Sequence, residues 1–343
     1  MARSLRIEKE NGVYHVINRG NYRQDVFINE GAHRAFEKCL FEACIKCDWI
    51  LEGFCVLTNH FHLVIRTPKG NLVYGMQWLQ STFANRYHKF GKVHGKLFQG
   101  RYKSLIVEET DYLGSLLHYV HLNPVRAGMV SVESLRAYRW SSFWYLHHPT
   151  NRADFMDCSG CLEAAGNLTD SSAGRKRYRE YLSWLSADSG ARKEQLFDRM
   201  CKGWALGSQD FKKSLLAEEI ERKRSLVEED KNLDAEQERY DGKELREANE
   251  LKWEQFLERG LSMLGKDRSA ILKDKKSEAW KILLAAAIKK HTSATNVWIT
   301  GRLNMGIPQA VSQNVGKFFV FCFRKGSKKV LQRHNYKING MTL

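Results

Sequence analysis

The N-terminal part of the chain alternates between strand-like and helix-like spacing of hydrophobic residues. Strand spacing, in which every second residue is apolar, covers residues 12–18, 49–57, 61–66 and 102–107. Helical spacing covers residues 30–46 and 72–90, and it returns in a segment that begins at Thr110 or Asp111. Because proline disfavours helix in the residue before it, this last helix is expected to end at Asn123–Pro124.

The resulting order of elements, β-α-β-β-α-β followed by a helix, predicts an α+β fold. It matches the split βαβ, ferredoxin-like plan, with an antiparallel sheet and two helices on one of its faces. In this plan the strand that contains residues 61–66 is central, and the last helix lies across or beside it.

The C-terminal part is patterned as helices. Residues 218–264 are dense in Glu, Lys and Arg and predict a pair of solvated helices. Three apolar helices are then expected, at 278–290 with Ser277 as its cap, at 296–303 with Thr295 as its cap, and from Gln309 to about Val320.

Residues 305–308 contain glycine and proline and predict a turn between the last two of these helices. Two short helices joined in this way are typical of a helix-turn-helix, although an ordinary three-helix packing domain has the same pattern. As a recognition helix, the last one would present Gln309, Gln313 and Lys317 to DNA. The basic residues after it favour DNA binding: Arg324, Lys325, Lys328, Lys329, Arg333 and Lys337.

These patterns predict three domains. Residues 1–148 would form the ferredoxin-like domain, and residues 149–270 a charge-rich helical connection. Residues 271–343 would form the helix-turn-helix domain with its basic tail.

The charge of the chain indicates the class of partner. A formal net charge of +16 and a pI of about 9.4 favour a polyanion, with nucleic acid ahead of a membrane surface, although a generally basic soluble protein is an alternative. The first residues lack the apolar core of a signal peptide, and no apolar run approaches the ~20 residues of a membrane span. We therefore expect a soluble, cytoplasmic protein that does not bind membranes.

The eight cysteines are expected to be reduced thiols, because no secretory signal precedes them. Cys44 and Cys47, and likewise Cys158 and Cys161, have the spacing of zinc ligands. Because Cys44 and Cys47 fall in an amphipathic helix, where buried free cysteine is common, a zinc site is the minor alternative.

Two short motifs carry candidate chemistry. His60 and His62 are separated by one residue on a strand, so that both imidazoles point to the same face, either to bind a metal or as an ordinary strand surface. Tyr119 and Asn123 are four residues apart and share one face of a helix. Tyr112, seven residues before Tyr119, is the main rival as a nucleophile. Together the motifs offer a divalent metal site, a nucleophile and a third ligand, which suits phosphodiester cleavage through a phosphotyrosine.

A run of cationic and aromatic residues lies between the two motifs, at residues 96–103. Cations for phosphates and rings for bases are what a single-stranded nucleic-acid groove requires, although a solvated basic face is the alternative. The candidate nucleic-acid-binding residues of this part of the chain are Arg19, Arg86, Arg101, Lys103 and Arg126.

Four stretches give the chain a resemblance to a known family. They are Tyr14-His-Val-Ile-Asn-Arg-Gly20, Thr58-Asn-His-Phe-His-Leu-Val64, Phe98-Gln-Gly-Arg-Tyr-Lys103 and Tyr119-Val-His-Leu-Asn-Pro-Val-Arg-Ala-Gly128. In this order they resemble the REP-associated tyrosine transposases, a branch of the single-tyrosine HUH transposases.

The resemblance implies a ferredoxin-like enzyme that cuts and joins single-stranded DNA near hairpins such as repetitive extragenic palindromes. It implies that Tyr119 is the nucleophile and stays linked to the 5′ end of the cut strand. It also implies that His60, His62 and Asn123 bind Mg²⁺ or Mn²⁺. The chain extends well beyond a minimal member of the family, so the role of its C-terminal domain is open.

Two other functions remain open at this point. The chain could be a DNA-binding regulator whose catalytic domain is silent or domesticated, or it could be an RNA-binding protein. Both a monomer and a homodimer are compatible with the sequence.

Overall fold

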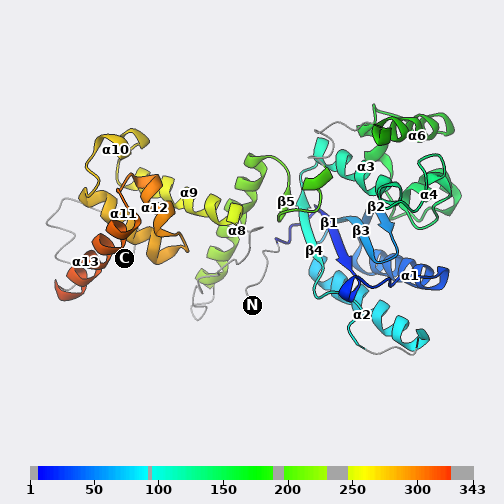
Figure 1. Ribbon diagram of the computed structural model, residues 1–343, viewed down its shortest axis with the longest axis horizontal. Helices are drawn as coiled ribbons and strands as arrows, with labels where there is room; N and C mark the ends of the chain where they lie inside the picture. Colours follow the sequence, from blue (N-terminus) through cyan, green and yellow to red (C-terminus); the bar gives the residue numbers. More distant parts are fainter. Residues whose placement is uncertain (1–6, 92–94, 188–196, 230–245, 326–343) are drawn as a thin grey trace. The chain divides into compact units, whose positions relative to one another are not determined.

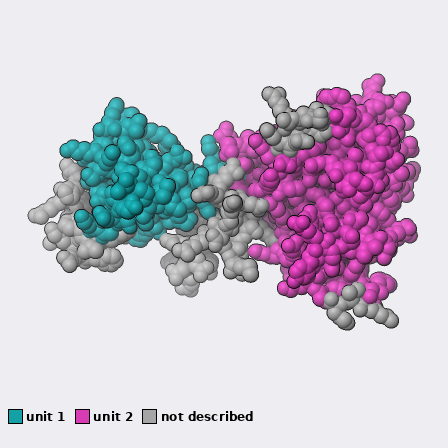
Figure 2. All heavy atoms as spheres, in the orientation of Figure 1, with its two compact units in different colours: residues 1–5, 213–343 teal, residues 6–212 magenta. Residues whose placement is uncertain are grey.

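The computed structural model describes residues 7–91, 95–187, 197–229 and 246–325. The chain forms two compact units, residues 6–212 and residues 213–343 together with 1–5 (Figure 2). The first unit thus includes residues 149–212, which the sequence pattern assigns to the connecting region. The three-domain division stays a prediction.

The first unit is built on a mixed sheet. Its strands are β1 (Gly12–Arg19), β2 (Ile50–Val56), β3 (His60–Thr67), β4 (Lys103–Val107) and β5 (Ala205–Leu206). They lie in the order β2-β3-β1-β4-β5 (Figure 1). All neighbours are antiparallel except β4 and β5, which are parallel. The first four strands have the predicted ferredoxin-like plan, with β3 in the interior, and the short β5 was not predicted.

One face of the sheet is covered by α1 (Glu30–Cys47) and α2 (Leu72–Gly91), and we call it the α1/α2 face (Figure 1). Asn29 begins α1 by accepting a hydrogen bond from the Ala32 N–H at 2.9 Å. Phe61 of β3 packs against Phe36 of α1, with ring centroids 4.7 Å apart, and Phe36 packs against Phe83 of α2. This face is therefore an aromatic core.

The other face is covered by α3 (Asp111–Arg126), and we call it the α3 face. Val13, Val64 and Val107 of the sheet share a core cluster with Leu116 and Leu117 of α3. Gly53 of β2 permits this close approach, because a Cβ there would lie 2.8 Å from Leu117 Cδ2.

The predicted end of α3 at Asn123–Pro124 is wrong, since the helix continues to Arg126. Proline lacks an N–H of its own, but the carbonyls around it can still accept helical hydrogen bonds from later residues. The next turn is still closed, because the Ala127 N–H donates to the Asn123 carbonyl at 2.9 Å. Arg126 thereby lies on the same helix as Tyr119 and Asn123.

The helices that follow add a second layer over α3. They are α4 (Ser142–His147), α5 (Ser159–Ala164) and α6 (Ser172–Ala187), with the short 3₁₀ turns η2 (Leu135–Ala137) and η3 (Pro149–Asn151); a further 3₁₀ turn, η1 (Asn21–Arg23), lies between β1 and α1. His121 of α3 bonds Tyr178 of α6 at 2.8 Å and Ser142 of α4 at 2.9 Å. These buried hydrogen bonds join the second layer to the helix that carries Tyr119.

The second unit is helical, as predicted. Its helices are α8 (Gln209–Glu229), which begins in the first unit, α9 (Arg246–Met263), α10 (Arg268–Lys273), α11 (Ala279–His291), α12 (Asn296–Leu303) and α13 (Pro308–Lys325). Trp280, Leu284, Ile299, Val311 and Val315 are among the buried residues of its core. No helix in the described ranges is long and apolar enough to cross a membrane.

The predicted caps of this unit have mixed outcomes. Thr295 caps α12, accepting a hydrogen bond from the Trp298 N–H at 3.2 Å. The Ser277 cap is wrong, because α11 begins one residue later than predicted, with Glu278 at the N-cap and no side-chain cap bond. Gln309, Gln313 and Lys317 are all exposed on α13, while the basic residues from 328 onward lie outside the described residues.

Candidate active site

The register of the sheet gathers polar side chains at one end of the α3 face. Ile17 of β1 is paired with both His62 and Lys103, so that these two side chains lie on the same face. Arg19 and His60 are paired one step further along that face. His15, two residues before Ile17, adds a third imidazole, which sequence reasoning did not select although it lies in the matched stretch 14–20.

A chain of hydrogen bonds fixes the orientation of His62. His15 Nδ1 lies 2.8 Å from the Met200 carbonyl, which only accepts, so we assign the proton of His15 to Nδ1. His15 Nε2 is then an acceptor, and His62 Nδ1 donates to it across 2.9 Å. The Nε2 lone pair of His62 is consequently left free for a metal, because the hydrogen bond to His15 holds the ring proton on Nδ1.

His60 is arranged in the same way by its neighbour. Its Nδ1 lies 2.6 Å from Asn59 Oδ1, to which it donates, and this again leaves Nε2 with its lone pair. Asn59 lies in the turn between β2 and β3, as predicted, and it also orients His60. The rings of His60 and His62 are 5.1 Å apart, so the two imidazoles lie together.

Burial keeps all three imidazoles neutral. It lowers the pKa of His15 and of His60 to about 4 in each case, and Lys103 and Arg19 respectively add to the effect. Burial, followed by the influence of His15 and His60, holds the pKa of His62 well below its usual range. Neutral imidazole is the form that binds metals.

Tyr119 lies against this cluster. Its ring centroid is 5.6 Å from that of His62 and 6.2 Å from that of His15. Burial raises the pKa of the phenol above its ordinary value, Cys201 adds to the rise, and Arg126 opposes it. The phenol is therefore protonated at neutral pH. Tyr112, the rival nucleophile, is partly buried against the α3-side core.

Asn123 lies one turn after Tyr119 and is 6 % exposed. Its Nδ2 atom is buried without a hydrogen-bond partner. An unsatisfied buried amide is costly in a folded protein, and the two ends of an amide are exchangeable by a flip. Asn123 thus has one amide end that is free to interact with a ligand.

A segment remote in sequence covers Tyr119. Phe197 packs edge-on against the tyrosine ring at 5.4 Å, and Cys201 Sγ lies 3.1 Å from Tyr119 Oη. The Arg126 guanidinium lies 4.9 Å from the Tyr119 ring centroid and 5.0 Å from that of Phe197. Only 7 % of Tyr119 is exposed, so a substrate reaches its oxygen only if this segment moves.

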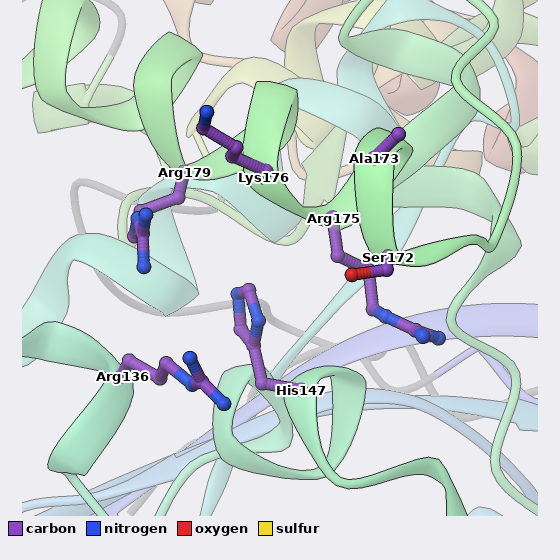
Figure 3. Close-up of a pocket in the computed structure, with 7 residues that line it drawn as sticks. All are labelled: Arg136, His147, Ser172, Ala173, Arg175, Lys176 and Arg179. Carbon is purple, nitrogen blue, oxygen red and sulfur yellow. The ribbon is translucent and has the colours of Figure 1, made fainter.

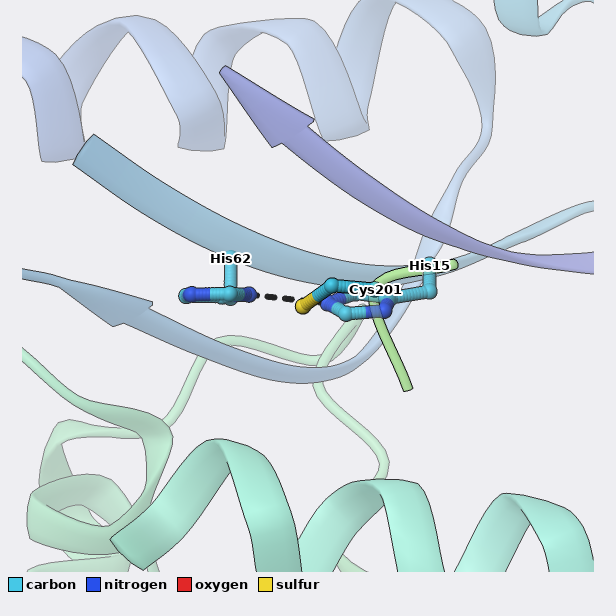
Figure 4. A group of neighbouring side chains, drawn as sticks. All are labelled: His15, His62 and Cys201. Atoms are coloured by element: carbon cyan, nitrogen blue, oxygen red, sulfur yellow. Dashed lines mark hydrogen bonds between the residues drawn. The ribbon is translucent and has the colours of Figure 1, made fainter. Parts of the chain in front are cut away.

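Two sets of residues could hold a divalent cation, and they share His62. The predicted set is His60, His62 and Asn123, in which each imidazole keeps its Nε2 lone pair and the amide of Asn123 has a free end. The second set is His15, His62 and Cys201, whose ligand atoms all lie within 4.8 Å of one another (Figure 4). Among the described residues, these three are the histidine, cysteine and carboxylate side chains that lie close enough together to hold a metal. The pairs Cys44/Cys47 and Cys158/Cys161 do not form such a group.

The predicted nucleic-acid-binding residues are distributed over several places. Arg19, Lys103 and Arg126 lie at the cluster, and their charges act on its imidazoles. Arg101 is exposed in the loop before β4. Arg86 lies on α2, where it pairs with Glu42 of α1 at 2.7 Å, so it is not brought to Tyr119.

Comparison with protein families gives a match over this domain. Residues 8–123 match the family model described as "Transposase IS200 like". The matched range begins before β1 and ends at Asn123, and it includes His15, His60, His62 and Tyr119. The family recognised over residues 8–123 is that of the IS200-like transposases. The transposase resemblance predicted from the sequence motifs is thereby confirmed for this domain.

The chain was also compared with solved structures and with curated proteins. A solved structure described as "Structure of the REP associates tyrosine transposase bound to a REP hairpin" is similar at 16 % identity and a TM-score of 0.38. That similarity covers 47 % of this chain and 96 % of the other. At this distance it carries no inference about DNA binding here. No curated protein matches the chain.

Proposed function

We propose that the protein is a metal-dependent endonuclease and strand transferase that acts on single-stranded DNA beside hairpins, such as repetitive extragenic palindromes. One observation carries the proposal. The phenol of Tyr119 lies against two neutral imidazoles, on a helix whose next turn presents the unsatisfied amide of Asn123. The family match supports transposase chemistry, and the hairpin target rests on the resemblance of the motifs.

In this mechanism Tyr119 Oη attacks a backbone phosphorus atom. The bond from phosphorus to the 3′ oxygen breaks, so the 5′ end becomes linked to Tyr119 and a 3′-OH is released. Arg126, Arg19 and Lys103 bind the phosphate oxygens by charge. Phe197 and Cys201 must leave Tyr119 before the strand can enter.

The metal site would be formed by His60, His62 and Asn123. When bound there, Mg²⁺ or Mn²⁺ supplies Lewis-acid polarisation of the phosphate. His15 and Asn59 orient the two ligating imidazoles through their Nδ1 atoms. The phenol, whose pKa burial raises, gives up its proton as the attack proceeds, and the departing 3′ oxygen takes up one proton to leave as the 3′-OH.

The test is the formation of a covalent adduct. A hairpin oligonucleotide with a labelled single-stranded flank should give a protein–DNA adduct that survives denaturing electrophoresis in Mg²⁺ or Mn²⁺. Tyr119→Phe should reduce the adduct by on the order of a thousandfold or more. Tyr112→Phe is the matched control, and it should leave the adduct unchanged. An undiminished adduct in Tyr119→Phe would overturn the assignment of the nucleophile.

The third ligand has its own test. Asn123→Ala should weaken metal-dependent cleavage far more than it weakens DNA binding in EDTA. Equal loss of both would show that Asn123 supports DNA binding or folding and does not ligate the cation.

We infer that the second unit adds DNA affinity through α13. Gln309, Gln313 and Lys317 are exposed at intervals of four residues, while Val311 and Val315 are buried behind them. This is the arrangement that a recognition helix requires. Gln313→Ala together with Lys317→Ala should reduce binding to double-stranded DNA and leave the amount of Tyr119 adduct on a saturating hairpin unchanged.

A silent DNA-binding protein is the second candidate, and the contact between Cys201 and Tyr119 favours it. In such a protein this cover would stay closed over the phenol. The same adduct assay separates the two functions, because a silent protein would bind the hairpin and form no adduct with any divalent cation.

A further inference from the structure

A second cluster of cations lies away from the Tyr119 cluster. A pocket of about 470 Å³ opens between η2, the end of α4 and the start of α6. Its lining contains four cationic side chains, one imidazole and two small residues, namely Arg136, Arg175, Lys176, Arg179, His147, Ser172 and Ala173 (Figure 3). None of the described residues that line it is a carboxylate.

The positive charge of this pocket is only partly neutralised. Arg175 pairs with Asp170 at 2.6 Å, and Lys176 lies 4.0 Å from Glu180 at the surface. Arg136 and Arg179 have no acidic partner within the described part of the chain. Bringing such charges together costs free energy, because like charges repel one another. An anion in the pocket would remove this cost.

His147 lies inside the pocket and is affected by the same positive charges. Its imidazole lies among Arg136, Arg179 and Lys176 in Figure 3. Its Nε2 atom is buried and has no hydrogen-bond partner. Burial lowers the pKa of His147 to about 4, and Arg136, Arg179, Arg175 and His148 add to the effect. With its proton on Nε2, this buried nitrogen among cations can donate a hydrogen bond to an anionic oxygen.

We propose that Arg136, Arg179, Lys176 and His147 bind a backbone phosphate of the DNA substrate, at a point on the DNA other than the phosphate cut by Tyr119. The DNA identity of the ligand rests on the function proposed above. Lys176 and Arg136 are exposed and open the pocket to a large polyanion, as backbone contacts require.

The fold links this pocket to the catalytic helix. Tyr178, which lies between Lys176 and Arg179 in sequence, is fully buried and bonds His121 of α3 at 2.8 Å. His121 also bonds Ser142 of α4, the helix that carries His147. A phosphate held in the pocket is therefore held in a fixed relation to Tyr119. Contacts of this kind set the register of DNA on a protein and carry no base specificity.

The test compares salt dependence of binding for the full chain. Affinity for a labelled hairpin and for an unrelated duplex is measured by fluorescence anisotropy at several salt concentrations, in EDTA. Arg136→Gln combined with Arg179→Gln should lower the slope of log affinity against log salt by about one to two. It should weaken both DNAs about equally, by about tenfold at low salt.

Arg177→Gln is the matched control, because Arg177 is exposed on the same helix and does not line the pocket. It should have no more effect than the loss of any surface charge. Circular dichroism melting of each variant confirms that it is folded.

The outcomes separate this proposal from the catalytic one. An unchanged salt slope in the double variant, while wild type binds both DNAs, overturns the pocket proposal and leaves the Tyr119 mechanism intact. If wild type forms no Tyr119 adduct but the double variant still lowers the salt slope, the Tyr119 mechanism is overturned and the pocket proposal stands. Inorganic phosphate is titrated in a second experiment. The pocket binds free phosphate, and the DNA proposal is wrong, if phosphate binds wild type but not the double variant while the salt slope for DNA is the same in both.

Discussion

The two faces of the sheet in the first unit are built from the same strands and serve different purposes. On the α1/α2 face, Phe61 packs among Phe36 and other rings and is fully buried. On the α3 face, its neighbour His62 lies against Tyr119 and bonds His15, while its neighbour His60 bonds Asn59. Because strand side chains alternate, one tripeptide supplies both a core residue and a candidate metal site. The aromatic face can thus stabilise a fold while the other face leaves polar groups unsatisfied.

The largest loss of stability is expected from a substitution on the α1/α2 face. Phe61→Ala should lower the free energy of unfolding by about 3–5 kcal/mol, because it leaves a cavity in a fully packed core. Chemical denaturation followed by circular dichroism measures this change. Phe90→Ala is the control, since Phe90 is 82 % exposed on α2, and it should cost under about 0.5 kcal/mol. Comparable costs at the two positions would contradict the packed core.

Acid should act on the buried histidines of the α3 layer. Burial lowers the pKa of His118 to about 4, below the value near 6.5 of an unfolded chain. The unfolded state therefore binds more protons, and the stabilisation present above about pH 6.5 is lost as the pH falls toward 4. For a shift of this size the loss is about 3 kcal/mol.

Denaturation at a series of pH values measures this loss. His118→Gln should reduce the slope of stability against pH between 6.5 and 4 by about one proton. Phe90→Ala, which removes no titratable group, should leave the slope unchanged. A slope that His118→Gln does not alter would show that the imidazole is not held neutral.

His15 should influence metal affinity without touching the cation. His15→Leu removes the acceptor of the His62 Nδ1–H bond, and loss of such a partner typically costs 10–100-fold in affinity, by the order of magnitude known for other sites. Titration with Mn²⁺ in the absence of DNA, followed by electron paramagnetic resonance, measures it. His15→Gln keeps an acceptor and should recover part of the affinity. Nitrogen NMR of His62 in the metal-free protein should show its proton on Nδ1 in wild type.

The smallest effect is expected at Cys201, and it discriminates between the two metal sets. If His60, His62 and Asn123 bind the cation, Cys201→Ala should change Mn²⁺ affinity by less than about twofold. If His15, His62 and Cys201 bind it, the loss should be about tenfold or more. With Co²⁺ in place of Mn²⁺, a thiolate charge-transfer band that Cys201→Ala abolishes would identify the second set. Cys55→Ala is the control, since Cys55 is paired with His62 in the sheet and belongs to neither set.

Several features of the protein could be predicted from local sequence. The alternation of residues 61–66 and the helical spacing of residues 72–90 are set by side chains within a few residues of one another, and both elements appear where expected. The wrong prediction at Pro124 came from applying a local preference alone. The preference against helix before proline is weak beside the packing of α3 on the sheet, so the helix continued to Arg126.

By itself, the sequence determined the ferredoxin-like order of elements, the shared face of His60 and His62, and the spacing of Tyr119 and Asn123. These depend on backbone periodicity, which acts over short distances along the chain. Only the tertiary structure decided that His15 would orient His62, that Cys201 would cover Tyr119, and that Arg136 would meet α6 in a basic pocket. Each of these contacts joins residues about 40 or more positions apart. Such contacts are set by strand register and helix packing, and no local pattern encodes them.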